Sequence, residues 1–236
     1  MSQQNQAYPY LKNSNIEKEA ISLLDSYANF KKKQIVAPIP VFEIIEFLGY
    51  DIDFRKDGIY KDNNILGGLR IADKIVEINE NISDNEGRMH FTAAHETGHI
   101  ILHVPLYKKQ KGIKEPVINE EIDMCRSDAG FDADKKDMAE FQADKFASYL
   151  LMPSSMVLKT FFSYYKKPVN VRKKSIKELF FPKPAFVKGY QIAEKILEKG
   201  RFDNVSKMAM LNRLIGLRLV KGLSYQKSKA MKQRSK

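Results

Sequence analysis

The chain has 236 residues, 43% of them hydrophobic, and carries a formal net charge of +11. This length supports a buried core without disulfide bonds, and the single cysteine, Cys125, excludes an intramolecular disulfide and is typical of a reducing compartment. The N-terminal sequence Met-Ser-Gln-Gln-Asn-Gln lacks the basic and apolar regions of a signal peptide. No apolar run approaches the about 20 residues that span a bilayer, so we expect a cytoplasmic protein that has no membrane partner.

The spacing of apolar residues predicts an α+β fold. A flexible N-terminus, 1–13, precedes a domain over 14–153, and a helical region over 154–220 is expected to wall the cleft of that domain. A tight turn at Asp73-Lys74 is expected to join two strands as a hairpin. The predicted strands lie near 50–55, 65–71 and 74–79, and the predicted helices near 15–29, 40–48, 84–103, 137–151, 154–165, 188–199 and 206–216.

The stretch His95-Glu96-Thr97-Gly98-His99 is the most informative part of the sequence. Residues four apart on a helix lie one turn above each other on the same face, so both imidazoles reach one zinc ion at about 2.0–2.1 Å. The glutamate beside the first histidine is placed to take a proton from a zinc-bound water. The motif therefore predicts His95 and His99 as metal ligands and Glu96 as the general base in hydrolysis of an amide bond.

The context of this motif favours a metal site over a chance match. Ser83-Asp84-Asn85-Glu86 has the form of a capping box that starts a helix, and Pro105 disfavours helical geometry at the residue before it. The helix is largely apolar, where unpaired polar side chains are costly. His103 lies about 12 Å along the helix from His95, too far to share its metal, and is interpreted as a core residue or as support for a ligand. Pro105 stands where a metzincin has its third histidine, which excludes that class.

The third ligand is expected from the predicted helix over 137–151. A catalytic zinc usually has three protein ligands, and Glu140 and Asp144 lie four residues apart on one face of that helix. Glu140 is predicted to complete a His/His/Glu set. Asp144 is predicted to accept the ring N–H of a ligand histidine and so to fix its tautomer. Glu120 and Glu121 are alternative ligands, in a polar segment without a helical pattern.

Two blocks of the sequence resemble the ImmA/IrrE family of metallopeptidases. Residues 91–103 read FTAAHETGHIILH, and residues 140–153 read EFQADKFASYLLMP. The family patterns are F-T-x-A-H-E-x-G-H-x-x-x-H and E-x-x-A-[ND]-x-F-A-x-x-L-L-M-P, and the resemblance extends over roughly residues 14 to 220. It implies a zincin-like metallopeptidase domain, in which a small sheet packs on helices that include the motif helix.

The resemblance also implies a function. Members of the family commonly act as cytoplasmic zinc-dependent proteases that cleave a helix-turn-helix repressor and so derepress mobile-element or stress-response genes. By resemblance, His95, His99 and Glu140 would bind zinc and Glu96 would be the general base. The alternative is a non-proteolytic zinc-containing regulator that binds a repressor or another partner. The presence of Glu96 argues against this alternative, because binding alone needs no general base.

The segment between the two blocks, 105–136, is charged and long for this family. Connections longer than about 15 residues are usually functional or disordered, so we expect a substrate-binding flap or a lid. Cys125 lies within it and has two interpretations: a thiolate that occupies the open position of zinc as a fourth ligand or latch, or a small packed hydrophobe. Because zinc peptidases of this architecture often add substrate to an edge strand, Gly67–Ile71 is our candidate for that edge.

The basic charge is concentrated at the C-terminus. Residues 221–236 contain six Lys or Arg and no acidic residue, which predicts a flexible solvated tail. The tail is also suited to weak attraction to DNA that carries a bound repressor, and no nucleic-acid-binding signature is present. We therefore expect a protein substrate, with nucleic acid bound at most weakly through the tail. The group that stabilises the transition state is not identified by the sequence; the candidates are Arg126, Tyr149, His103 and Arg213.

Overall fold

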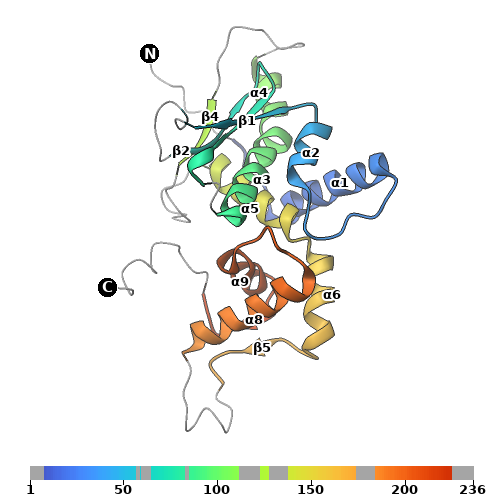
Figure 1. Ribbon diagram of the computed structural model, residues 1–236, viewed down its shortest axis with the longest axis vertical. Coiled ribbons are helices and arrows are strands. Elements are labelled where there is room, and N and C mark those ends of the chain that lie inside the picture. The colour runs from blue at the N-terminus through green and yellow to red at the C-terminus, as the bar shows by residue number, and fades with distance from the viewer. Residues whose placement is uncertain are drawn as a thin grey trace. The chain divides into compact units, whose positions relative to one another are not determined.

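The computed structural model describes residues 8–56, 59, 65–82, 85–111, 123–127, 138–173 and 184–224. The chain forms two compact units (Figure 1). The first unit consists of Met1–Gln34 and Pro40–Leu150, and the second of Ile35–Ile39 and Leu151–Lys236. In the part of the chain that is described, no helix combines the length and the apolar character needed to cross a membrane.

The first unit is built around one buried helix, α3. Every residue from Phe91 to Ile100 on this helix is buried. The Asn85 side chain caps its start by accepting a hydrogen bond from the Arg88 backbone N–H at 3.0 Å, whereas the predicted capping residue, Ser83, lies outside the described residues. The helices of this unit are α1 (Asn13–Lys31), α2 (Val41–Phe47), α3 (Glu86–Leu102), α4 (Val104–Lys111) and α5 (Met138–Leu151), with a short 3-10 helix at Glu80–Ile82.

Pro105 lies just after the end of one helix, as predicted, but it also lies in the first turn of a second helix that was not predicted. The helix α3 ends at Leu102, close to the predicted end, and His103 is its C-cap. The next helix, α4, begins at once at Val104 and contains Pro105 in its first turn. A proline is tolerated there because the first backbone N–H groups of a helix have no partner within the helix. The sequence interpretation treated the proline only as a helix terminator and so missed α4.

A four-stranded sheet covers α3, in the order β1-β3-β2-β4. The strands are β1 (Asp51–Arg55), β2 (Ile65–Arg70), β3 (Ile75–Asn79) and β4 (Asp123–Ser127). The strand β1 is parallel to β3, and the other two pairs are antiparallel. The predicted hairpin between β2 and β3 is present, with Leu69 opposite Val76. Lys74, in the turn, has a φ of 55°, a left-handed conformation that is common in tight turns.

The sheet corrects one expectation. The strand that we selected as a substrate-accepting edge, Gly67–Ile71, corresponds to β2, but β2 lies between β3 and β4. The backbone of β4 pairs with it in antiparallel register, with Cys125 opposite Gly68 and Arg126 opposite Gly67. The candidate edge was therefore wrong, because β4 comes from a charged segment with no alternating pattern that would have revealed a fourth strand.

The second unit consists mainly of helices. Its elements are α6 (Ser154–Tyr164), β5 (Val169–Asn170), α8 (Ala185–Gly200), α9 (Lys207–Gly216) and β6 (Val220–Lys221), and β5 and β6 pair in parallel. Phe161 and Phe202 are among its fully buried side chains. The segment Ile35–Ile39 is tied to this unit because the Asn204 side chain donates a hydrogen bond to the Ile39 carbonyl at 2.9 Å. That residues 154–220 wall a cleft stays a prediction.

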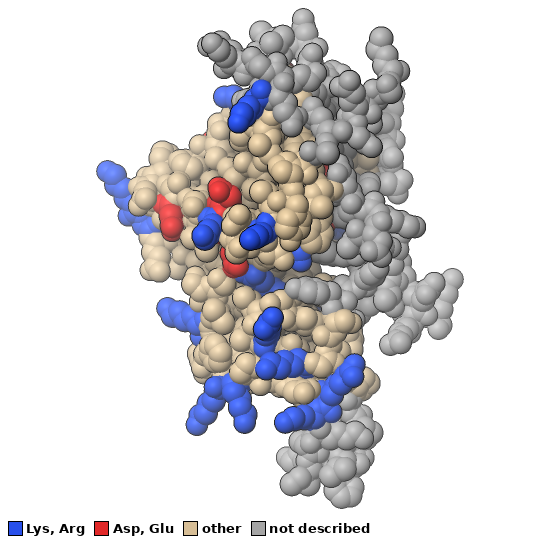
Figure 2. Space-filling model, turned by 180° about the vertical axis from the view of Figure 1, so that it is seen from behind, with Lys and Arg blue, Asp and Glu red and all other residues tan. Residues whose placement is uncertain are grey.

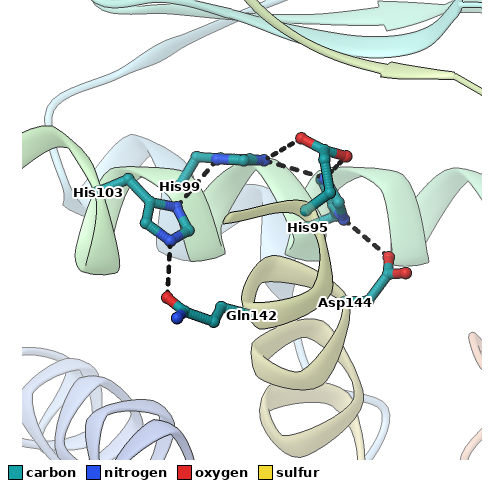
Figure 3. A network of polar contacts seen from close by, with 6 residues as sticks. His95, His99, His103, Gln142 and Asp144 are labelled. Atoms are coloured by element: carbon teal, nitrogen blue, oxygen red, sulfur yellow. Dashed lines mark hydrogen bonds and ion pairs between the residues drawn. The ribbon is translucent and has the colours of Figure 1, made fainter. Parts of the chain in front are cut away.

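The predicted fold class is confirmed: a small sheet packs on helices that include the HExxH helix. The sheet and the helix are in close contact at Gly67 of β2, where a Cβ atom would lie 2.4 Å from Thr92 Cγ2 and 2.7 Å from Glu96 Oε1. Because these distances are shorter than van der Waals contact, any larger residue at this position would require Thr92 or Glu96 to move. The sheet therefore lies directly over the central part of α3 (Figure 3).

Candidate metal centre

Three histidines form a row along one face of α3. His95, His99 and His103 follow one another at the four-residue spacing of a helix, and each is no more than 1% exposed. The ring centroids of His95 and His99 are 4.8 Å apart, and those of His99 and His103 are 4.9 Å apart. The buried row faces α5, as Figure 3 shows.

The glycine of the motif allows α5 to approach this row. A Cβ atom on Gly98 would lie 3.1 Å from Ala143 Cα, 3.2 Å from the Ala143 carbonyl oxygen and 3.2 Å from Phe146 Cβ. Ala143 is itself fully buried, and its small side chain contributes to the close packing of the two helices. This contact between α3 and α5 brings carboxylates on α5 within reach of the imidazoles on α3.

Glu140 is the carboxylate that meets both histidines of the motif. His99 Nε2 lies 3.1 Å from Glu140 Oε1, and His95 Nε2 lies 3.3 Å from Glu140 Oε2. The two Nε2 atoms are 3.0 Å apart. Donor atoms around a tetrahedral zinc ion at about 2.0–2.1 Å are separated by about 3.3 Å. The three side chains thus have the spacing and the donor chemistry of a metal site, with ligand atoms within 4.8 Å of one another.

Asp144 orients His95. Its Oδ1 lies 2.9 Å from His95 Nδ1, and its side chain is 3% exposed. An ionised carboxylate only accepts hydrogen bonds, so His95 Nδ1 carries the hydrogen. In the neutral ring Nε2 then carries none, and it is the atom that faces Glu140. The predicted contact between Asp144 and a histidine of the motif is present in the structure.

The electrostatics of this group suit a cation. Burial alone would raise the pKa of Glu140, but the contacts with His95 and His99 outweigh it and hold that pKa well below its ordinary value. Burial lowers the pKa of His99. Burial also lowers the pKa of His103 to about 4, with a further contribution from His99. An anionic carboxylate beside neutral imidazoles is a donor set that binds divalent metal ions.

Glu96 lies on a different side of α3 from the row of histidines. It is 0% exposed, and its carboxylate lies against β2, where the Cβ that Gly67 lacks would be 2.7 Å from Glu96 Oε1. Because Glu96 follows His95 by one residue, its side chain points to another side of α3, and its carboxylate lies between this helix and the sheet. Its role as general base stays a prediction.

The other residues that the sequence singled out either lie outside the described part of the chain or have other contacts in it. The backbone of Cys125 lies in β4 opposite Gly68, but the position of its thiol lies outside what the structure describes, as do Glu120 and Glu121. The side chain of Arg126 is likewise not described. Arg213 donates a hydrogen bond from Nε to the Met152 carbonyl at 2.9 Å, within the second unit.

Gln142 is a residue of this centre that sequence reasoning missed. It is 1% exposed, and its Oε1 lies 3.1 Å from His103 Nε2. Its Nε2 donates a hydrogen bond to the Pro9 carbonyl at 2.8 Å, and the ring of Tyr8 packs edge-on against His103 with centroids 4.8 Å apart. The sequence feature that could have revealed it is a glutamine two residues after Glu140, among the apolar residues of the same predicted helix.

The fold and the site together define a class of protein: an α+β domain with a His/His/Glu group on two packed helices, as in metallopeptidases. A family model described as the IrrE N-terminal-like domain, peptidase M78, matches residues 53–180, more than half of the 236 residues. The chain belongs to this family, which confirms the resemblance inferred from the two sequence blocks. No curated protein matches the chain.

Proposed function

We propose that this protein is a zinc-dependent endopeptidase that hydrolyses a peptide bond in a protein substrate. The observation that carries the proposal is the group of His95, His99 and Glu140, whose ligand atoms lie within 4.8 Å of one another. Membership of a metallopeptidase family supports the same reaction class. Three protein ligands leave one position open for water, which is the arrangement of catalytic rather than structural zinc sites.

In the proposed reaction, His95, His99 and Glu140 hold the metal and Glu96 moves a proton. Zinc, when bound, supplies a positive charge that acidifies water and polarises the scissile carbonyl. The Glu96 carboxylate accepts the proton of the attacking water as a general base, and its burial keeps bulk water from competing for that proton. Asp144 keeps His95 in the tautomer that presents Nε2. A His/His/carboxylate set also accepts manganese or iron, so elemental analysis of the purified protein identifies the metal.

The proposed substrate is a helix-turn-helix transcriptional repressor, in the regulation of a mobile element or of a stress response. This part rests on the resemblance to the ImmA/IrrE family, and so does the proposed cytoplasmic location. The peptidase would bind a repressor that occupies its operator, and the basic tail over 221–236 would contribute weak attraction to the operator DNA.

The test is incubation of the zinc-loaded protein with the repressor encoded beside its gene. Mass spectrometry of the products would show cleavage at one position for wild type. The Glu96→Gln variant keeps the size of the side chain but removes the base, and a lost general base typically costs about 10²–10⁴-fold in rate. His90→Asn is a matched control, because His90 is on the same helix but contacts the Glu86 carbonyl and Phe42 instead of the metal centre.

Two outcomes would contradict the proposal in different ways. Cleavage that persists at the wild-type rate in Glu96→Gln would defeat the proposed mechanism. A repressor that is displaced from DNA by wild type without being cut would instead support the non-proteolytic regulator.

The proposal for Cys125 needs a separate experiment. If its thiolate is a fourth ligand or a latch, Cys125→Ser would lower zinc affinity or raise basal activity under reducing conditions. Zinc content and activity equal to those of wild type would leave Cys125 as a packed hydrophobe.

A further inference from the structure

A continuous chain of hydrogen bonds leads from His99 to the backbone near the N-terminus. His99 Nδ1 lies 3.0 Å from His103 Nδ1, His103 Nε2 lies 3.1 Å from Gln142 Oε1, and Gln142 Nε2 donates to the Pro9 carbonyl at 2.8 Å. All three side chains are at most 1% exposed. Figure 3 shows the part of this chain from His99 to Gln142, at the opposite end of the histidine row from Asp144.

The position of each hydrogen follows from the far end of the chain. The Pro9 carbonyl only accepts, so the Gln142 amide turns its NH₂ group toward Pro9 and its Oε1 toward His103. Because Oε1 only accepts, His103 Nε2 carries the hydrogen. With its ring hydrogen on Nε2, the neutral His103 ring has a lone pair on Nδ1, which lies 3.0 Å from His99 Nδ1 and accepts its hydrogen. His99 Nε2 then carries no hydrogen, and it faces Glu140 Oε1 at 3.1 Å.

We propose that His103 and Gln142, anchored on the Pro9 carbonyl, are positioning residues that fix the tautomer of the metal ligand His99. They would do for His99 what Asp144 does for His95, so that both rings present Nε2 to the same ion. Partners of this kind orient ligand histidines and raise metal affinity in zinc enzymes. This inference rests on the proposed metal binding by His95, His99 and Glu140.

The two orienting groups differ in charge. His95 is held by an ionised carboxylate, whereas His99 is held by a neutral histidine and a neutral amide. A neutral partner fixes the ring without adding another negative charge beside Glu140. The orientation of His99 also depends on a longer series of hydrogen bonds, because the last acceptor, the Pro9 carbonyl, belongs to the segment before α1. Tyr8 of the same segment packs on His103. The metal centre therefore depends on residues far from both sequence blocks.

The test compares two substitutions of His103 that differ in chemistry. His103→Asn places an amide oxygen where Nδ1 lies and keeps an acceptor for His99, whereas His103→Leu fills the space with apolar atoms only. Zinc dissociation constants are measured by competition with a chromogenic chelator, and Tm is recorded for each protein. We expect His103→Leu to weaken zinc binding by about 10–100-fold and His103→Asn to weaken it less. His90→Leu, on the same helix, should bind zinc as wild type does.

If His103 merely filled space, zinc would bind more tightly to His103→Leu than to His103→Asn. The reason is that burying an amide carries a larger desolvation penalty than burying a leucine of similar size. Tighter zinc binding by His103→Leu than by His103→Asn would therefore overturn the proposal, as would equal affinity in wild type and His103→Leu. Wild type that binds no zinc would refute the proposed function itself, and the inference with it.

A second measurement reads the hydrogens directly. Long-range ¹H–¹⁵N spectra of the zinc-loaded protein with labelled histidine report which ring nitrogen carries a hydrogen. We expect the hydrogen on Nδ1 of His95 and His99 and on Nε2 of His103. A hydrogen on Nδ1 of His103 would contradict the proposed chain. So would a hydrogen of His99 that stays on Nδ1 in His103→Leu as firmly as in wild type.

Discussion

At the scale of the residue, Gly98 shows how one missing side chain sets the geometry of the centre. It lies between the two histidines of the motif only one position from His99, and it lets α5 come close enough for Glu140 to meet both Nε2 atoms. A metal-binding histidine pair requires only the four-residue spacing, but the third ligand from another helix requires this close approach.

Gly98→Ala tests that dependence. The added Cβ would meet backbone atoms of Ala143 at 3.1 and 3.2 Å, so α5 has to move. We expect overpacking to lower the free energy of unfolding by about 1–3 kcal/mol, partly offset by the better helix propensity of alanine, and zinc binding to weaken. Urea unfolding and chelator competition measure the two effects. Wild-type values for both would show that the distance between α3 and α5 is not set by this glycine.

At the scale of the element, the two helices that carry the candidate metal ligands were predicted, and the strand β4 was not. Residues 84–103 and 137–151 carry strong helical periodicity, and the structure has α3 and α5 there. Asp144 was found because it lies one turn from Glu140. Gln142 was missed because a hydrogen bond to Pro9, 133 residues away, leaves no pattern in the local sequence. The strand β4 was missed because its place depends on pairing with β2.

The segment before α1 is predicted to support the metal centre. A chain that begins at residue 8 keeps the Tyr8 ring and the Pro9 carbonyl, whereas a chain that begins at residue 10 loses both contacts to His103 and Gln142. We expect only the shorter chain to bind zinc more weakly, with unchanged helix content in both. Circular dichroism and chelator competition on the pair measure this. Equal zinc affinity in the two chains would show that the anchor at Pro9 is dispensable.

At the scale of the whole molecule, the two units differ in charge. The first unit contains 19 Lys and Arg against 25 Asp and Glu, a net charge of −6, and the second contains 21 against 4, a net charge of +17. Figure 2 shows on one face Lys and Arg side chains that stand out from the lower part of the molecule, where none of the described residues in view is Asp or Glu. The basic character that the sequence interpretation assigned to the tail is thus shared by the whole second unit.

This distribution sharpens the expectation for nucleic acid. Removal of residues 225–236 takes away five of the 21 basic residues of the second unit, so the shortened chain should still bind duplex DNA weakly. The slope of log affinity against log salt concentration should become shallower, because fewer counterions are released. Fluorescence anisotropy over a series of salt concentrations measures both proteins. Complete loss of binding in the shortened chain would place the whole interaction in the tail.

In the proposed metal centre, Glu140 binds the ion and Glu96 does not. The most direct measurement is the zinc affinity of Glu140→Gln and Glu96→Gln beside wild type, by chelator competition. We expect one zinc ion per chain in wild type, nearly unchanged zinc affinity in Glu96→Gln, and zinc binding at least about 100-fold weaker in Glu140→Gln, since a ligand is lost where even outer partners contribute about 10–100-fold. Unchanged zinc affinity in Glu140→Gln, or an equal loss in both variants, would contradict this assignment of the ligand.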